Sequence, residues 1–153
     1  MTPQPPLFTI GYEQATPVAV LDELKRARVK LLVDVRAVAA SRRPGFSKRQ
    51  LAAALDDAGI AYLHLQKLGT PAEGRQAGRA GDLERLWRIY DKHIKTAEAQ
   101  AALGELIAIL RSGRRVCLLC YERDANACHR SRIAALVRRR TRATIDNLIA
   151  KLG

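Results

Sequence analysis

Residues 120–132 read CYERDANACHRSR and form the densest group of reactive side chains in the chain. A helix that begins near Cys128 would direct the free N–H groups of its first turn, together with Arg130 and Arg132, toward a bound anion. The same position would lower the pKa of the Cys128 thiol, because a helix N-terminus and nearby cations favour the thiolate. Cys128 is therefore a candidate nucleophile, and the alternative is an inert, buried thiol.

The spacing of the cysteines argues against a redox pair and against a metal centre. Cys117 and Cys120 are three residues apart on a predicted strand, so they would face opposite sides of a sheet, and Cys117 is assigned to the core. Cys120, Cys128 and His129 do not have a recognised zinc spacing, and adjacent Cys and His side chains on a helix diverge. An odd count of three cysteines also argues against a disulfide framework. We therefore predict neither a metal nor a cofactor.

Polar side chains follow each apolar run of the chain. They are Gly11, Tyr12 and Glu13, then Asp34 and Arg36, then His64 and Gln66, and finally Cys120, Tyr121 and Glu122. Asp34 and Glu122 are the candidate acid–base groups, since a carboxylate beside an anion site can move a proton or hold a ribose hydroxyl. The alternatives are that Asp34 pairs with Arg36, that Glu122 is a solvated acid or a helix cap, and that Gly11 only turns the chain.

Basic residues are in excess and come in blocks. Lysine and arginine number 27 against 15 acidic residues, which gives a formal net charge of +12. The blocks are Arg42, Arg43, Lys48 and Arg49; Arg75, Arg79, Arg85 and Arg88; and Arg130, Arg132, Arg138, Arg139, Arg140 and Arg142. Such a surface favours a nucleic acid or nucleotide as partner, with Tyr12, Phe46 or Tyr62 stacking bases. The alternative is an arginine-rich, solvated surface.

The apolar runs that must position these residues alternate with helical patterns. The predicted strands are Leu7–Ile10, Lys30–Val35, Ile60–Leu65 and Arg115–Leu119. The predicted helices run from Pro17 to about Arg28, after a cap at Thr16, from a cap at Ser47 to Gly59, over Asp82–Lys95 and Ala97–Arg111, and from about Cys128. Near-continuous apolar strands separated by helices indicate a single three-layer α/β domain with a mostly parallel sheet of at least four strands and helices on both faces.

The domain is expected to span residues 1–153, with its core over about 7–140 and a basic tail over 141–153 that forms either a short helix or an edge strand. Four glycines and one proline in Gly69–Gly81 predict a long, mobile surface loop. No apolar run reaches the about 20 residues that cross a bilayer, and the N-terminus lacks the features of a secretory signal. We expect a soluble, cytoplasmic protein without a membrane partner, and the oligomeric state stays open.

Several motifs occur in a fixed order between Leu7 and Val137: TIGY, DVR followed by SRRPGFSK, YLHLQKLGTP with GRQAGRAGD, and LLCYERDANACHRSRIA. In these motifs the chain resembles family 488 of the domains of unknown function. Ala39 stands where the family commonly has proline, so we expect a less rigid loop there. The resemblance implies a compact α/β fold and supplies no established reaction. Its motifs are matched by Gly11, Tyr12, Asp34, Arg36, Ser41, Arg42, Phe46, His64, Gly69, Cys120, Glu122, Cys128, His129 and Arg130.

Ligands of open parallel sheets bind outside the carboxyl ends of the strands, so these residues are expected to meet at one edge. The leading hypothesis is that this edge binds a nucleotide or nucleic-acid phosphate and acts on it or only holds it. The candidate catalytic residues are Asp34, Glu122 and Cys128, and the candidate binding residues are Gly11, Tyr12, Arg36, Ser41, Arg42, Phe46, His64, Cys120, His129 and Arg130.

Two other functions are open. A thiol-dependent enzyme would use Cys128 or Cys120, helped by His129, on a small phosphate- or sulfur-containing substrate. A non-catalytic adaptor would bind RNA or protein through the basic surface and would not need either carboxylate.

Overall fold

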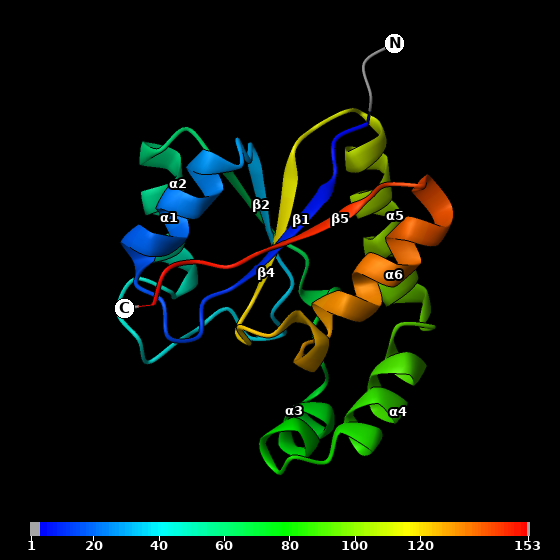
Figure 1. Cartoon of the computed structure of the whole chain (residues 1–153). Coiled ribbons are helices and arrows are strands. Elements are labelled where there is room, and N and C mark those ends of the chain that lie inside the picture. Colours follow the sequence, from blue (N-terminus) through cyan, green and yellow to red (C-terminus); the bar gives the residue numbers. More distant parts are fainter. Residues whose placement is uncertain (1–3, 153) are drawn as a thin grey trace.

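The computed structural model describes residues 4–152 of the chain. Within this range five strands form one parallel sheet in the order β3-β2-β4-β1-β5 (Figure 1). The strands are β1 (Leu7–Gly11), β2 (Leu31–Asp34), β3 (Ala61–His64), β4 (Val116–Cys120) and β5 (Ile145–Leu148). The helices are α1 (Pro17–Arg26), α2 (Lys48–Asp57), α3 (Ala72–Arg79), α4 (Leu83–His93), α5 (Ala97–Arg111) and α6 (Arg130–Thr141), with short 3-10 turns η1 (Gln66–Leu68) and η2 (Ala125–Ala127). The predicted three-layer α/β fold is confirmed.

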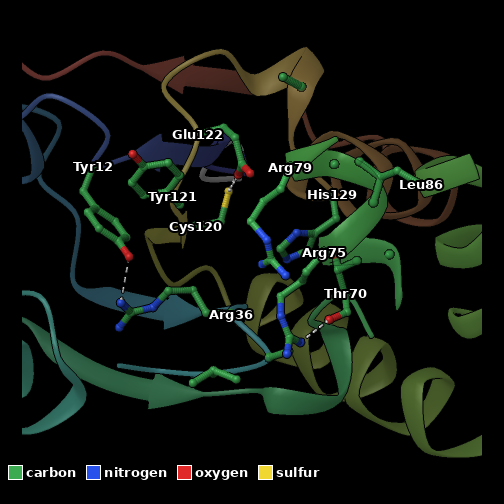
Figure 2. Close-up of a pocket in the computed structure, with 15 residues that line it drawn as sticks. Tyr12, Arg36, Thr70, Arg75, Arg79, Leu86, Cys120, Tyr121, Glu122 and His129 are labelled. Atoms are coloured by element: carbon green, nitrogen blue, oxygen red, sulfur yellow. Dashed lines mark hydrogen bonds between the residues drawn. The ribbon is translucent and has the colours of Figure 1, made fainter. Parts of the chain in front are cut away.

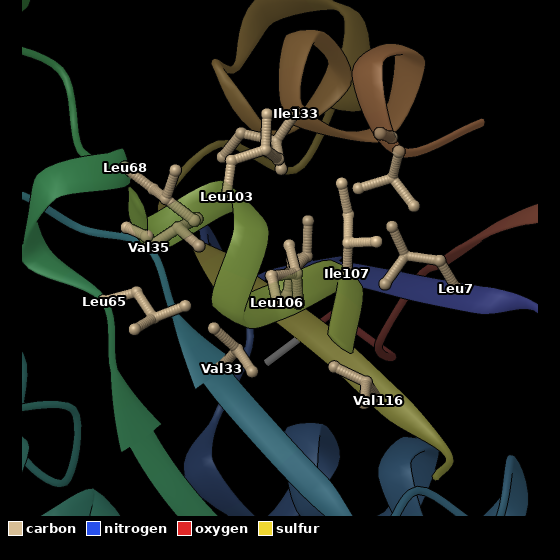
Figure 3. Packing of buried hydrophobic residues seen from close by; sticks show 14 of the residues in the cluster. Leu7, Val33, Val35, Leu65, Leu68, Leu103, Leu106, Ile107, Val116 and Ile133 are labelled. Atoms are coloured by element: carbon tan, nitrogen blue, oxygen red, sulfur yellow. The ribbon is translucent and has the colours of Figure 1, made fainter. Parts of the chain in front are cut away.

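The sheet separates two apolar cores. Leu7 and Val33 pack with residues of α5 and α6, whereas Phe8 and Leu32 pack with residues of α1 and α2. Figure 3 shows the first of these cores, where α5 lies across the strands. Because successive strand residues point to opposite faces and both faces are covered, the central strands β1, β2 and β4 are buried at every position and must be largely apolar. This explains why the continuous runs KLLVDV and VCLLC predict buried parallel strands.

The connections diverge at the carboxyl end of the sheet. After β2 the chain enters α2, which packs in the core with α1, and after β4 it enters α6, which packs in the core with α5. Because β2 and β4 are neighbours in the sheet, their connections leave toward opposite faces. Such a point leaves a crevice outside the strand ends, where ligands of open α/β sheets bind.

The predicted cap residue makes its capping hydrogen bond at the start of α1 but not at the start of α2. The Thr16 hydroxyl accepts a hydrogen bond from the Ala19 amide at 3.1 Å, and Pro17 occupies the first turn, as predicted. Ser47 takes the position before α2, but its hydroxyl makes no capping bond. It accepts from the Ser41 amide at 3.0 Å instead, and so closes the loop that precedes the helix.

The prediction of a mobile loop over Gly69–Gly81 was wrong, because α3 occupies most of it. A Cβ atom at Gly74 would lie 2.6 Å from the Thr70 methyl group and 3.4 Å from Ile89, and at Gly78 it would lie 3.5 Å from Leu86. Glycine is a poor helix former, and here its small size lets α3 approach α4 closely. Figure 1 shows these two helices as a pair beyond the carboxyl edge of the sheet.

The tail contributes an edge strand. Residues 145–148 form β5, parallel to β1, which decides between the two predicted alternatives. The Thr9 hydroxyl donates a hydrogen bond to the Asn147 side-chain oxygen at 2.6 Å. A membrane-spanning helix is not found within residues 4–152, because none of the helices there has the necessary length and apolar character.

Candidate functional site

A cavity of about 260 Å³ opens at the carboxyl ends of β1, β2 and β4, between the strand ends and α3 (Figure 2). Five of the candidate residues line it: Tyr12, Arg36, Cys120, Glu122 and His129. Four chain segments therefore meet there, as expected for the divergence of the connections between β2 and β4. Its mixture of aromatic, cationic and sulfur-containing side chains makes this cavity the candidate functional site.

The positive charges of the cavity that are least engaged with other protein groups come from α3. Arg75 and Arg79 line the cavity and point into it in Figure 2. Arg75 donates a hydrogen bond to the Thr70 carbonyl at 2.9 Å, and Arg79 makes no ion pair with any carboxylate of residues 4–152. Glu122 supplies the carboxylate of the lining, and burial raises its pKa, which favours the neutral form. The lining therefore carries an excess of positive charge.

Arg36 is held by a buried ion pair with Asp34. Its Nε and Nη2 atoms donate to the two carboxylate oxygens at 2.9 and 2.7 Å, and its backbone amide donates to the same group at 3.1 Å. The Tyr62 hydroxyl adds a fourth bond at 2.5 Å. Burial by itself would lower the pKa of Arg36, but the hydrogen bonds and charge of Asp34 raise it above its ordinary value. Both charges are compensated within the protein.

This network leaves Arg36 few groups to offer a ligand. Nη1 donates to the Tyr12 hydroxyl at 3.2 Å and to the Phe46 carbonyl at 2.8 Å. The Phe46 ring is fully buried and stacks on Tyr12, with ring centroids 4.5 Å apart. Arg36 therefore positions the wall that carries Tyr12, while Asp34 and Phe46 lie behind that wall and do not line the cavity.

Gly11 acts through close packing. A Cβ atom at this position would lie 1.7 Å from the carbonyl oxygen of Glu122. Only glycine permits the segments after β1 and β4 to approach this closely. Gly11 therefore lets Tyr12 and Glu122 share one cavity, without lining it itself.

Arg130 is completely buried below the loop that follows β4. It donates to the Thr9 hydroxyl at 3.2 Å, to Cys120 Sγ at 3.0 Å and to the carbonyls of Glu122 and Arg123 at 2.5 and 3.2 Å. Among residues 4–152 no carboxylate forms an ion pair with it, and burial lowers its pKa. Arg130 thus holds the loop in place and does not reach the cavity.

Cys120 and Cys128 form a disulfide in this structure, against the expectation from the odd cysteine count. Cys117 is free, buried and part of the opposite core, so it lies on the other face of the sheet from Cys120. The helix predicted from about Cys128 starts at Arg130, and Cys128 itself has an extended backbone with φ −124° and ψ 146°. Cys128 therefore does not lie in the first turn of the helix.

His129 turns toward the two sulfur atoms. The sulfur atoms of Cys120 and Cys128 and a ring nitrogen of His129 all lie within 4.8 Å of one another. The argument that adjacent Cys and His side chains diverge assumed a helix at both positions, and this assumption was wrong. His129 Nε2 lies 2.7 Å from the Val35 carbonyl, and burial lowers the pKa of His129 to about 4, so the ring is neutral near pH 7.

Three further candidate residues lie away from the cavity lining. Ser41 belongs to the loop that Ser47 closes, and Arg42 is exposed. His64 ends β3, and its Nε2 lies 2.7 Å from the Arg36 carbonyl, so it supports the segment that carries Arg36.

Sequence reasoning placed Arg75 and Arg79 only in a basic block. Their spacing of four residues puts two arginines on one face of a helix, and this signal was hidden by the glycines that predicted a loop. Thr70 also lines the cavity; it lies in the motif YLHLQKLGTP but was not among the candidate residues.

The architecture is that of an open, parallel α/β domain with a cationic cavity at the carboxyl edge of its sheet. The model of the family described as domain of unknown function DUF488 matches residues 16–137, which is more than half of the chain. The chain belongs to this family. The matched range begins after Gly11 and Tyr12, which nevertheless pack against its β4 segment. No curated protein and no solved structure matches the chain.

Proposed function

We propose that the cavity binds the phosphate group of a nucleotide or of a nucleic-acid end. The observation that carries this proposal is the presence of Arg75 and Arg79 on one wall, with no carboxylate of residues 4–152 paired to Arg79. Guanidinium groups bind phosphate well because their N–H groups form a planar fork. Glu122 is the acidic side chain that faces them, and burial raises its pKa.

The walls of the cavity suit the rest of a nucleotide. Tyr12 and Tyr121 line it, and their rings meet edge to face with centroids 5.3 Å apart. Aromatic side chains at such a wall can stack on a base. A volume of about 260 Å³ lies just below the usual range for ligand pockets, so the proposal is for one nucleotide unit and not for a length of duplex.

The test compares two double variants of equal charge. Arg75→Ala with Arg79→Ala removes two cations from the cavity, whereas Arg85→Ala with Arg88→Ala removes two exposed cations of α4 that do not line it. Binding of AMP, inorganic phosphate and a short 5′-phosphorylated single strand is measured by calorimetry at low salt. We expect the first variant to lose about tenfold or more in affinity and the second to lose little.

Two results would contradict the proposal. If the wild-type protein binds none of these ligands at low salt, the cavity is not a phosphate site. If both double variants weaken binding equally and the affinity falls steeply with salt, the interaction belongs to the whole basic surface, as in the adaptor hypothesis. Glu122→Gln separates binding from catalysis. Asp34 is not suited to this test, because it holds Arg36 and its replacement would disturb the wall that carries Tyr12.

A further inference from the structure

Three donor atoms of the kind that zinc prefers converge beside the cavity. Cys120 ends β4, and Cys128 and His129 precede α6, so two chain segments bring their donors within 4.8 Å of one another. Thiolate sulfur and imidazole nitrogen are the usual ligands of Zn²⁺ in proteins. All three side chains are buried, which shields the group from bulk water.

His129 is oriented as a metal ligand. Its Nε2 lies 2.7 Å from the Val35 carbonyl oxygen, which can only accept a hydrogen bond. Nε2 therefore carries the proton, and Nδ1 presents a lone pair 3.8 Å from Cys128 Sγ. Metal-bound histidines in proteins commonly donate their second ring N–H to a carbonyl in this way, which fixes the tautomer and the ring orientation.

The charges around Cys120 favour a reduced and ionised sulfur. Arg130 is buried without an ion pair in the described chain, and its Nη1 lies 3.0 Å from Cys120 Sγ. A disulfide is neutral and leaves this guanidinium uncompensated, whereas a thiolate supplies the missing negative charge. Glu122 Oε2 lies 3.7 Å from the same sulfur. Two thiolates would balance the two positive charges of Zn²⁺.

We propose that two-electron reduction of the Cys120–Cys128 bond by an external thiol or phosphine, which is itself oxidised, frees two thiols that release their protons on binding Zn²⁺. Cys120, Cys128 and His129 are then the protein ligands of a zinc site. Cys120 and His129 also line the cavity, so the fourth position of a tetrahedral ion opens toward it. Three protein ligands with one open position are characteristic of catalytic zinc sites, whereas structural sites have four. The proposal does not depend on phosphate binding, because the arginines of α3 take no part in holding the ion.

The experiment uses the full chain, reduced with a phosphine under anaerobic conditions. After incubation with Zn²⁺ and removal of the excess, bound metal is counted by elemental analysis, and Co²⁺ is used as a spectroscopic substitute. We expect one Zn²⁺ per chain, an intense near-ultraviolet band from thiolate-bound Co²⁺, and no binding by the oxidised protein.

Single variants identify the ligands. Cys120→Ser, Cys128→Ser and His129→Ala should each weaken Zn²⁺ binding by about 100-fold or more. Loss of a group that only hydrogen-bonds to a metal ligand already costs about 10–100-fold, and these variants remove a ligand itself. The matched controls are Cys117→Ala, which removes the cysteine of the opposite core, and His93→Ala, which removes a half-buried histidine of α4. Both controls should bind Zn²⁺ like the wild type.

The proposal is overturned if the reduced wild-type protein retains no Zn²⁺ while its thiols readily close to the disulfide, which would make them a redox pair. It is also overturned if Co²⁺ binds without a thiolate band, or if the controls lose the metal as the cluster variants do. Should a cluster variant fail to fold, the Co²⁺ spectrum of the wild type still decides whether sulfur is a ligand. Loss of phosphate binding in the α3 variants, with Zn²⁺ retained, would affect only the proposed function.

Discussion

Two arginines are buried near the same edge of the sheet, and the protein compensates them differently. Arg36 meets the Asp34 carboxylate through two side-chain hydrogen bonds. Arg130 meets two carbonyls, a hydroxyl and a sulfur atom, and it has no ion pair among residues 4–152. Accordingly, the pKa of Arg36 is raised by Asp34 against the effect of burial, whereas burial lowers the pKa of Arg130.

The difference gives Arg36 and Arg130 separate roles at this edge of the sheet. A charge with a matched counter-ion is a rigid support, and Arg36 uses it to hold the wall of Tyr12. A charge held only by neutral acceptors is open to a further anion, and the group within reach is the sulfur of Cys120. Both side chains looked like phosphate ligands in the sequence, and the structure turns both inward.

The largest effect is expected from breaking the paired arginine. Asp34→Asn leaves the Arg36 charge buried without its partner and should lower the free energy of unfolding by roughly 3–5 kcal/mol, measured by urea denaturation. The double variant Asp34→Leu with Arg36→Met removes both charges and should be more stable than Asp34→Asn. A loss below about 1 kcal/mol in Asp34→Asn would show that the ion pair does not support this wall.

A smaller loss is expected for the second arginine. Arg130→Met removes hydrogen bonds to Thr9, Glu122 and Arg123 but leaves no opposite charge behind, so we expect roughly 2–3 kcal/mol. The loss should grow when the disulfide is reduced, because a Cys120 thiolate then loses its counter-ion. Arg132→Met, in the same helix, is the control: Arg132 is partly exposed and should cost less than about 1 kcal/mol. Equal losses in oxidised and reduced protein would argue against a thiolate beside Arg130.

Tyr62 tests how much the support of Asp34 depends on its fourth hydrogen bond. Tyr62→Phe removes the hydroxyl that donates to the carboxylate at 2.5 Å and leaves the bonds from Arg36 intact. We expect a loss of about 1.5 kcal/mol in the free energy of unfolding, as for one bond to a charged group. Tyr121→Phe changes an exposed ring and should stay within about 0.5 kcal/mol of the wild type. If the two variants behave alike, the short contact contributes nothing.

The smallest effect on stability is expected at the cavity mouth. Arg79→Ala removes an exposed side chain without an ion pair in the described chain. The free energy of unfolding, measured by urea denaturation, should therefore change by less than about 0.5 kcal/mol. A loss as large as that of Arg130→Met would show that Arg79 supports the fold. It would then not be a free ligand-binding group.

The sequence by itself determined the layers and the edge of the sheet at which the candidate residues meet. Continuous apolar runs must be buried on both faces, and parallel strands bring their carboxyl ends together, so Tyr12, Arg36, Cys120, Glu122 and His129 were expected to meet, and they line one cavity. Local patterns failed where packing between helices outweighed them. The glycines of α3 predicted a loop, yet they allow close packing on α4.

Only the tertiary structure decided what each side chain at that edge does. Asp34 faces Arg36 rather than a ligand, Arg130 lies under a loop, and Cys128 and His129 turn toward Cys120 because the helix starts two residues after Cys128. Strand periodicity depends on neighbours along the chain, so a sequence shows it directly. The partner of a buried charge is chosen by desolvation and by the groups that packing brings within a few ångströms, and these come from separate parts of the chain.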